Sequence, residues 1–113
     1  LIVVPANWPE DRMEHFKTLL KARAIENQCY IAGINRVGHA RTLSYSGESM
    51  VVDPLGKELI HGGREEALLV ADLDLEMVRQ YRAAFPAKQD RKPELYRKLA
   101  EELRMKSETE DLT

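Results

Sequence analysis

Two short apolar segments, at residues 1–4 and 29–34, flank a stretch with helical periodicity at residues 12–27. The apolar residues of that stretch recur at the spacing of one helix face, and they are Met13, Phe16, Leu20 and Ala24. A helix between two strands is typical of a crossover connection, which joins parallel strands of one sheet. We therefore expect both strands in the same sheet, with Pro5 closing the first strand and Asp11 capping the helix.

A turn pattern follows further along the chain. Asp53, Pro54 and Gly56 occupy the first, second and fourth positions of a segment that favours a type I turn. Residues 49–52 and 57–60 should therefore pair as an antiparallel hairpin around it. Because strands alternate with helices before this hairpin, we predict an α/β (α+β) layered fold with a mixed sheet.

The remaining segments predict one more strand, two helices and two irregular regions. The apolar run at residues 67–73 indicates a strand, and Asp74 suits the N-cap of a helix at residues 75–84. Pro93 suits the first position of a last helix. We expect residues 37–48 to form a surface loop and residues 107–113, which carry three acidic side chains, to be disordered.

Composition excludes several classes of function. The chain has 17 Lys and Arg against 19 Asp and Glu, so its formal net charge of −2 gives no electrostatic reason to bind nucleic acid or an anionic membrane. No apolar run approaches the ~20 residues of a membrane-spanning helix. One Cys cannot form an internal disulfide, which fits a reducing, cytoplasmic location.

The residues themselves indicate no complete catalytic set. Cys29, the only thiol, lies in an apolar segment and is expected to be a buried core residue. His15, His39 and His61 lack the spacing of a metal site, so no metal is predicted. Arg23 and Glu26 are three residues apart and should pair on the first helix.

The beginning of the chain suggests a fragment. Residue 1 is Leu, and residues 1–4 read as a buried strand that needs neighbours on both sides. The chain offers no element before it, so we expect this sequence to be part of a larger domain.

A series of motifs resembles the nitrilase, or carbon–nitrogen hydrolase, superfamily. The motifs occur in this order: PANWP at 5–9, LLKARAIENQCY at 19–30, GINRVG at 33–38, YSGES at 45–49, VDPLG at 52–56 and ADLD at 71–74. Arg82 and the Phe85-Pro86 pair extend the resemblance to about residue 90. It is strongest to the omega-amidase branch, which hydrolyses 2-oxoglutaramate and similar α-keto acid amides.

The resemblance implies a fold and a chemistry. The family fold is an α–β–β–α sandwich that dimerises, and residues 1–90 would be its C-terminal half, followed by a helix and acidic tail at 91–113. The family uses a Glu–Lys–Cys triad without a cofactor, in which Cys forms a thioester with the acyl group of the amide. Those triad positions lie upstream of the matched segment. Cys29 aligns with an ordinary strand position, so no catalytic residue is expected in this chain.

The resemblance also suggests roles for residues that are present. Asn7 and Trp8 would border the substrate pocket, although Trp8 could equally be core packing. His15, Arg23 and Glu26 would lie on a helix at the dimer interface. The implied partners are a small-molecule amide, the N-terminal half of the same domain and a second copy in a homodimer or larger assembly, with no nucleic acid or membrane.

Two functions from different classes remain. The chain could be the C-terminal half of a cytoplasmic amidase and would then be inactive alone. Alternatively, it could be a non-catalytic interaction or dimerisation module. The module would bind through the strand edge at residues 1–4 and the stripe of Met13, Phe16 and Leu20.

Overall fold

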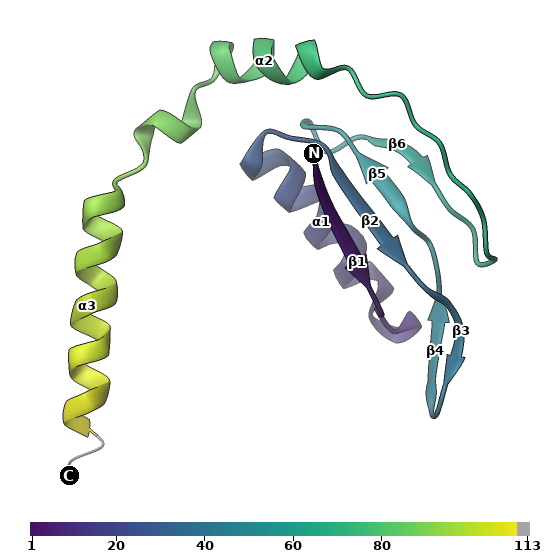
Figure 1. Cartoon of the computed structure of the whole chain (residues 1–113), viewed down its shortest axis with the longest axis horizontal. Helices are drawn as coiled ribbons and strands as arrows, with labels where there is room; N and C mark the ends of the chain where they lie inside the picture. The colour runs from purple at the N-terminus through teal and green to yellow at the C-terminus, as the bar shows by residue number, and fades with distance from the viewer. Residues whose placement is uncertain (111–113) are drawn as a thin grey trace. The chain divides into compact units, whose positions relative to one another are not determined.

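The computed structural model describes the backbone of residues 1–110 and the side chains of residues 1–104. Two compact units are present, Leu1–Arg82 and residues 83 onward. The first unit contains a sheet with one long helix against it, and a separate two-stranded hairpin extends from the end of that sheet (Figure 1). Within the described residues, no helix is both long and apolar enough to cross a membrane.

The main sheet has four strands in the order β1-β2-β5-β6. The strands are β1 (Ile2–Ala6), β2 (Ile31–Asn35), β5 (Met50–Val52) and β6 (Glu58–His61). β1 runs parallel to β2, whereas β5 and β6 pair antiparallel to their neighbours. The predicted crossover and the mixed sheet are therefore confirmed.

Helix α1 (Met13–Asn27) contributes the apolar face that its spacing predicts. The buried core joins this face to the sheet, and its members are Met13, Phe16, Leu20, Ala24, Cys29, Ile31, Met50 and Val52. Full burial of one large apolar side chain stabilises a fold by about 1.5–3 kcal/mol. Because the α1 stripe is already buried, it is not available as the contact surface that the module hypothesis assigned to it.

Pro5 lies inside β1 instead of closing it. The backbone nitrogen of Ile2 donates to the Tyr30 carbonyl, and the Ala6 carbonyl accepts from Arg36 N–H. Alternate residues of a strand direct their main-chain groups to opposite sides, so the nitrogen of Pro5 faces away from β2. β1 is the edge of the described sheet, where a residue without an N–H is tolerated.

The prediction that residues 37–48 form a surface loop is wrong. β3 (Val37–Ala40) and β4 (Leu43–Ser46) form an antiparallel hairpin there. Arg41 makes the tight turn possible by adopting the left-handed conformation, with φ of 54°. The hairpin faces no apolar core, which explains why its strands lack the alternation by which strands are recognised.

The prediction of a strand at residues 67–73 is also wrong. This apolar segment is extended but pairs with no strand among the described residues. Leu68 is 91% exposed and Val70 is 76% exposed. β-propensity alone therefore does not produce a strand, since a strand also needs a hydrogen-bonded neighbour.

The turn at Asp53 and the cap at Asp74 are confirmed. Asp53 accepts the Gly56 N–H on its main-chain carbonyl at 3.0 Å, and its Oδ1 accepts the N–H groups of Leu55 and Lys57. Asp74 Oδ1 accepts the first free N–H groups of α2 (Leu75–Ala84) at 2.9 and 3.2 Å.

Asp11 does not cap α1, so that prediction is wrong. A 3₁₀ turn, η1 (Glu10–Arg12), precedes the helix, and it places Arg12 at the N-cap without a side-chain hydrogen bond.

The second unit contains η2 (Ala87–Asp90) and α3 (Pro93–Glu110). α3 begins at Pro93, as predicted. Its backbone remains helical through Glu110, so the first four residues of the tail expected to be disordered are helical. Residues 111–113 of that tail lie outside the described residues.

Gly33 allows α1 to approach β2 closely. A Cβ at this position would lie 2.3 Å from a Leu20 methyl carbon and 3.0 Å from the Phe16 ring. We predict that Gly33→Ala lowers the free energy of unfolding by about 1–3 kcal/mol, as overpacking does. Gly63→Ala is the matched control, since among the described residues, its two chain neighbours aside, no atom lies within 4 Å of its added Cβ. Urea unfolding measures both, and equal stabilities would contradict this close packing.

Glu58 generates a prediction about pH. The hydrogen bond from Lys21, at 2.6 Å, holds the pKa of Glu58 below its ordinary value of 4.5. A lowered carboxyl pKa adds stability that is present above about pH 4.5 and is lost as the pH falls through the lower, folded value. Both side chains are more than a third exposed, so the contribution should be below about 1 kcal/mol.

The test compares wild type with Glu58→Gln by urea unfolding between pH 7 and pH 2. The difference in unfolding free energy should shrink as the pH falls. Lys21→Met, introduced into both proteins, should make this pH-dependent difference smaller, because Lys21 is the main cause of the lowered pKa of Glu58. A difference that is the same at pH 7 and pH 2 would show that the ion pair contributes no stability.

Candidate functional site

The carboxyl ends of β1 and β2 bring together the residues of the candidate site. Asn7 and Trp8 directly follow β1, and Asn35 is the last residue of β2. Ala6 and Asn35 are register partners in the parallel pair. In sheets with parallel strands, ligands bind beyond the carboxyl ends of the strands. We call residues 7–9, which leave the sheet at this edge, the Trp8 loop.

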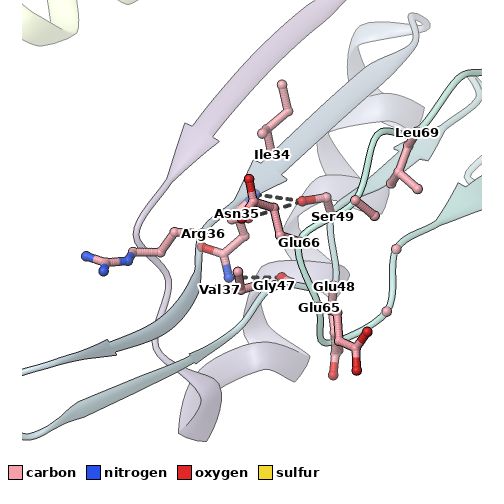
Figure 2. A pocket seen from close by; sticks show the side chains of 13 residues that line it. Ile34, Asn35, Arg36, Val37, Gly47, Glu48, Ser49, Glu65, Glu66 and Leu69 are labelled. Carbon is pink, nitrogen blue, oxygen red and sulfur yellow. Dashed lines mark hydrogen bonds between the residues drawn. The ribbon is translucent and has the colours of Figure 1, made fainter.

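Asn35 makes hydrogen bonds to two other segments through its side chain. Its Oδ1 accepts the Trp8 N–H at 2.7 Å, while its Nδ2 donates to the carbonyls of Trp8 and Gly47 at 3.1 and 3.0 Å. The Asn35 backbone N–H donates to Ser49 Oγ at 2.9 Å, and that hydroxyl donates back to the Asn35 carbonyl. Figure 2 shows the bonds from Asn35 to Ser49 and Gly47.

Trp8 is both a packing residue and a cavity wall. Its ring lies 5.5 Å from the Phe16 ring between centroids, and its indole Nε1 donates to the Arg12 carbonyl at 2.6 Å. The same residue lines an apolar groove of about 520 Å³ together with Asn7 and parts of β1 and α1. Core packing and a place at the border of a pocket, the two alternatives for Trp8, are therefore compatible.

A second, more polar cavity of about 330 Å³ is lined by Asn35 and its neighbours (Figure 2). Its acidic lining residues are Glu48, Glu65 and Glu66. Glu48 has a φ of 55° and pairs with Lys17 at 2.5 Å and with Arg64 at 3.7 Å, while Arg64 also pairs with Glu10. The hydrogen bond to Glu48 raises the pKa of Lys17 above its ordinary value. These pairs hold the Glu48 carboxylate beside the cavity.

Cys29 lies away from this site. It is 5% exposed and precedes the amino end of β2, whereas the Trp8 loop and Asn35 lie at the carboxyl end. Its expected burial in the core is confirmed. Among the described residues, no group of three His, Cys, Asp or Glu side chains could hold a metal ion.

The three residues assigned to a dimer interface lie on α1, outside its buried face. His15, Arg23 and Glu26 are exposed, and Arg23 pairs with Glu26 at 2.5 Å as predicted. His15 lines a shallow depression that also includes Trp8 and Arg12. These side chains are accessible in the single chain.

Sequence reasoning missed Asn35 and Ser49. Asn35 ends an apolar strand and is 7% exposed. A polar residue at a buried strand position must find hydrogen-bond partners, and this could have marked Asn35 as a residue that binds another segment.

The comparisons with known proteins agree on one family. The family model described as carbon-nitrogen hydrolase matches residues 5–83. A 2-oxoglutaramate amidase of Bacillus subtilis is 40% identical over 96 residues, which is 85% of this chain and 37% of that protein. An omega-amidase of Escherichia coli K12 is 44% identical over 92 residues, which is 80% of this chain and 36% of that protein.

Solved structures show the same fold. A CN-hydrolase superfamily protein from Xanthomonas campestris, with an arsenic adduct in its active site, superposes with a TM-score of 0.74 at 38% identity. The match covers 81% of this chain and 36% of that one. An amidase of the nitrilase superfamily from Nesterenkonia gives a TM-score of 0.61 at 32% identity, with coverages of 87% and 35%.

The chain thus spans little more than a third of the length of the curated relatives it matches. The family model nevertheless covers most of the chain, and the matched Xanthomonas campestris structure has a similar fold over the aligned part. The chain belongs to the carbon-nitrogen hydrolase family.

Proposed function

We propose that this chain is the C-terminal part of an amidase that converts a small α-keto acid amide to the acid and ammonia. The main support is 40% identity to a protein named 2-oxoglutaramate amidase, with 44% identity to one named omega-amidase. The Trp8 loop adds geometric support, because it lies at the edge of the sheet where ligands of such folds bind.

The reaction divides into two acyl transfers. A cysteine thiolate attacks the amide carbonyl, and a carboxyl group protonates the departing nitrogen. Ammonia is released, and the acyl group remains bound to the cysteine as a thioester. Water then attacks the thioester, the same carboxyl group accepts its proton, and the acid is released. An ammonium group stabilises the oxyanion in both steps. We assign all three groups to a preceding part of the domain, as the family resemblance implies. Cys29 does not supply the thiolate, because it is buried before the amino end of β2, away from the Trp8 loop.

Asn7 and Trp8 would bind the substrate. The Asn7 amide can donate to a carboxylate or a carbonyl oxygen, and the Trp8 ring can form an apolar wall. Both line the groove beside β1 and α1. The second cavity, with its acidic lining, suits an α-keto acid anion poorly.

The preceding half of the domain would cover the edge of β1. Ile2 is 44% exposed and Val3 is 51% exposed, although both lie in a strand. The exposed residues of α1, His15, Arg23 and Glu26, would face a second copy in a homodimer. The same open edge also favours the alternative function, a non-catalytic module that binds another chain through β1.

Ammonia release distinguishes the two functions. The complete polypeptide that carries this segment should release ammonia from 2-oxoglutaramate, while the 113-residue chain alone should release none. Cys29→Ala should leave the rate of the complete polypeptide unchanged. Ammonia release by the short chain that is lost in Cys29→Ala would place the nucleophile in this segment and refute the assignment. An inactive complete polypeptide would favour the interaction module.

Asn7 provides a test of substrate binding. In the complete polypeptide, Asn7→Asp should lower kcat/KM for 2-oxoglutaramate about tenfold, or ~1.4 kcal/mol, because two carboxylates would then repel each other. For a neutral amide substrate, the same substitution should lower kcat/KM less than it does for 2-oxoglutaramate. Gln80→Glu, the same amide-to-carboxylate change at an exposed position of α2, is the matched control. Equal losses for both substrates would exclude Asn7 from carboxylate binding.

A further inference from the structure

We infer that Asn35 is a positioning residue that sets the main chain of the Trp8 loop and thereby the substrate-binding surface. The inference rests on the proposed function, in which Asn7 and Trp8 contact the substrate. Asn35 itself would act only through them, because its side-chain hydrogen bonds go to main-chain atoms of Trp8 and Gly47.

The ladder between β1 and β2 cannot hold this loop. The register ends at Ala6 and Asn35, and the last main-chain bond beside it joins Arg36 N–H to the Ala6 carbonyl at 3.3 Å. Two residues later, both the N–H and the carbonyl of Trp8 bond to the Asn35 side chain. The position of the Trp8 peptide groups therefore depends on a side chain 27 residues away.

These contacts require an amide. Asn35 accepts one hydrogen bond and donates two, and its side chain is nearly fully buried. An ionised Asp has the same shape but only accepts hydrogen bonds. It would set a carboxylate against the carbonyls of Trp8 and Gly47, so both contacts would become repulsive.

The main chain of Asn35 is held by contacts that do not involve its side chain. Ser49 Oγ accepts the Asn35 N–H and donates to the Asn35 carbonyl. Ser49→Ala removes these bonds but leaves the side-chain contacts to Trp8 in place. Ser49 thus offers a variant in the same locality that perturbs the end of β2 without removing the contacts that position the loop.

The first experiment uses Trp8 as its own probe, since it is the only Trp in the chain. In the 113-residue chain, Asn35→Asp should shift the Trp8 emission to longer wavelength and increase its quenching by acrylamide. Gln80→Glu, the same amide-to-carboxylate change on the exposed surface of α2, should leave both unchanged. The emission wavelength and acrylamide quenching of Trp8 in Ser49→Ala should lie closer to the wild-type values than those in Asn35→Asp.

The second experiment measures kinetics in the complete polypeptide. Displacement of binding groups by about 1 Å can cost roughly 100-fold in rate, so Asn35→Asp should lower kcat/KM for 2-oxoglutaramate at least about tenfold. The larger part should come from a raised KM, because the loop binds the substrate and does not carry the nucleophile. Gln80→Glu should keep wild-type constants. Asn35→Ala, which removes the contacts without adding charge, should change KM in the same direction.

The outcomes separate the two claims. Wild-type Trp8 emission and wild-type KM in both Asn35→Asp and Asn35→Ala would overturn the positioning role. A loss confined to kcat would also contradict it. If the wild-type complete polypeptide releases no ammonia, the proposed function fails, whereas the emission of Trp8 still decides whether Asn35 sets the loop. If circular dichroism shows that Asn35→Asp does not fold, Asn35→Ala decides the question.

Discussion

The parallel pairing of β1 with β2 is the constraint on which the rest of the first unit depends. Parallel neighbours need a crossover, and α1 supplies it while burying its apolar face on the sheet. Gly33 lets the helix approach β2 closely. The same pairing brings two carboxyl ends to one edge, so the Trp8 loop and Asn35 become neighbours although 27 residues separate Trp8 from Asn35.

Much of this fold could be predicted because its signals are local. The α1 face follows from helical spacing, and the Asp53 turn and the Asp74 cap follow from side chains that bond their own neighbours. Two errors came from tertiary context. The β3–β4 hairpin faces no core, so it has no apolar alternation, and residues 67–73 have the composition of a strand without a described partner.

The candidate site was less accessible to prediction. Asn7 and Trp8 could be selected only through a family resemblance, since neither has a local pattern that indicates binding. Asn35 and Ser49 were not predicted as site residues, because their contacts span 12 to 27 residues and depend on the fold itself. The Lys17–Glu48 pair has the same origin, since it joins α1 to the segment before β5. Local patterns therefore predict elements, whereas the side chains that connect elements emerge only from their packing.

The open edge of β1 has a consequence for handling the chain in solution. Among the described residues, no strand pairs with its outer side, and the side chains of Leu1, Ile2 and Val3 are exposed beside it. An apolar edge of this kind is a template for further strands. In a concentrated preparation, copies of the chain can add to one another there, so the yield of dispersed protein should fall as concentration rises. Pro5 offers no N–H to an added strand and interrupts that growth.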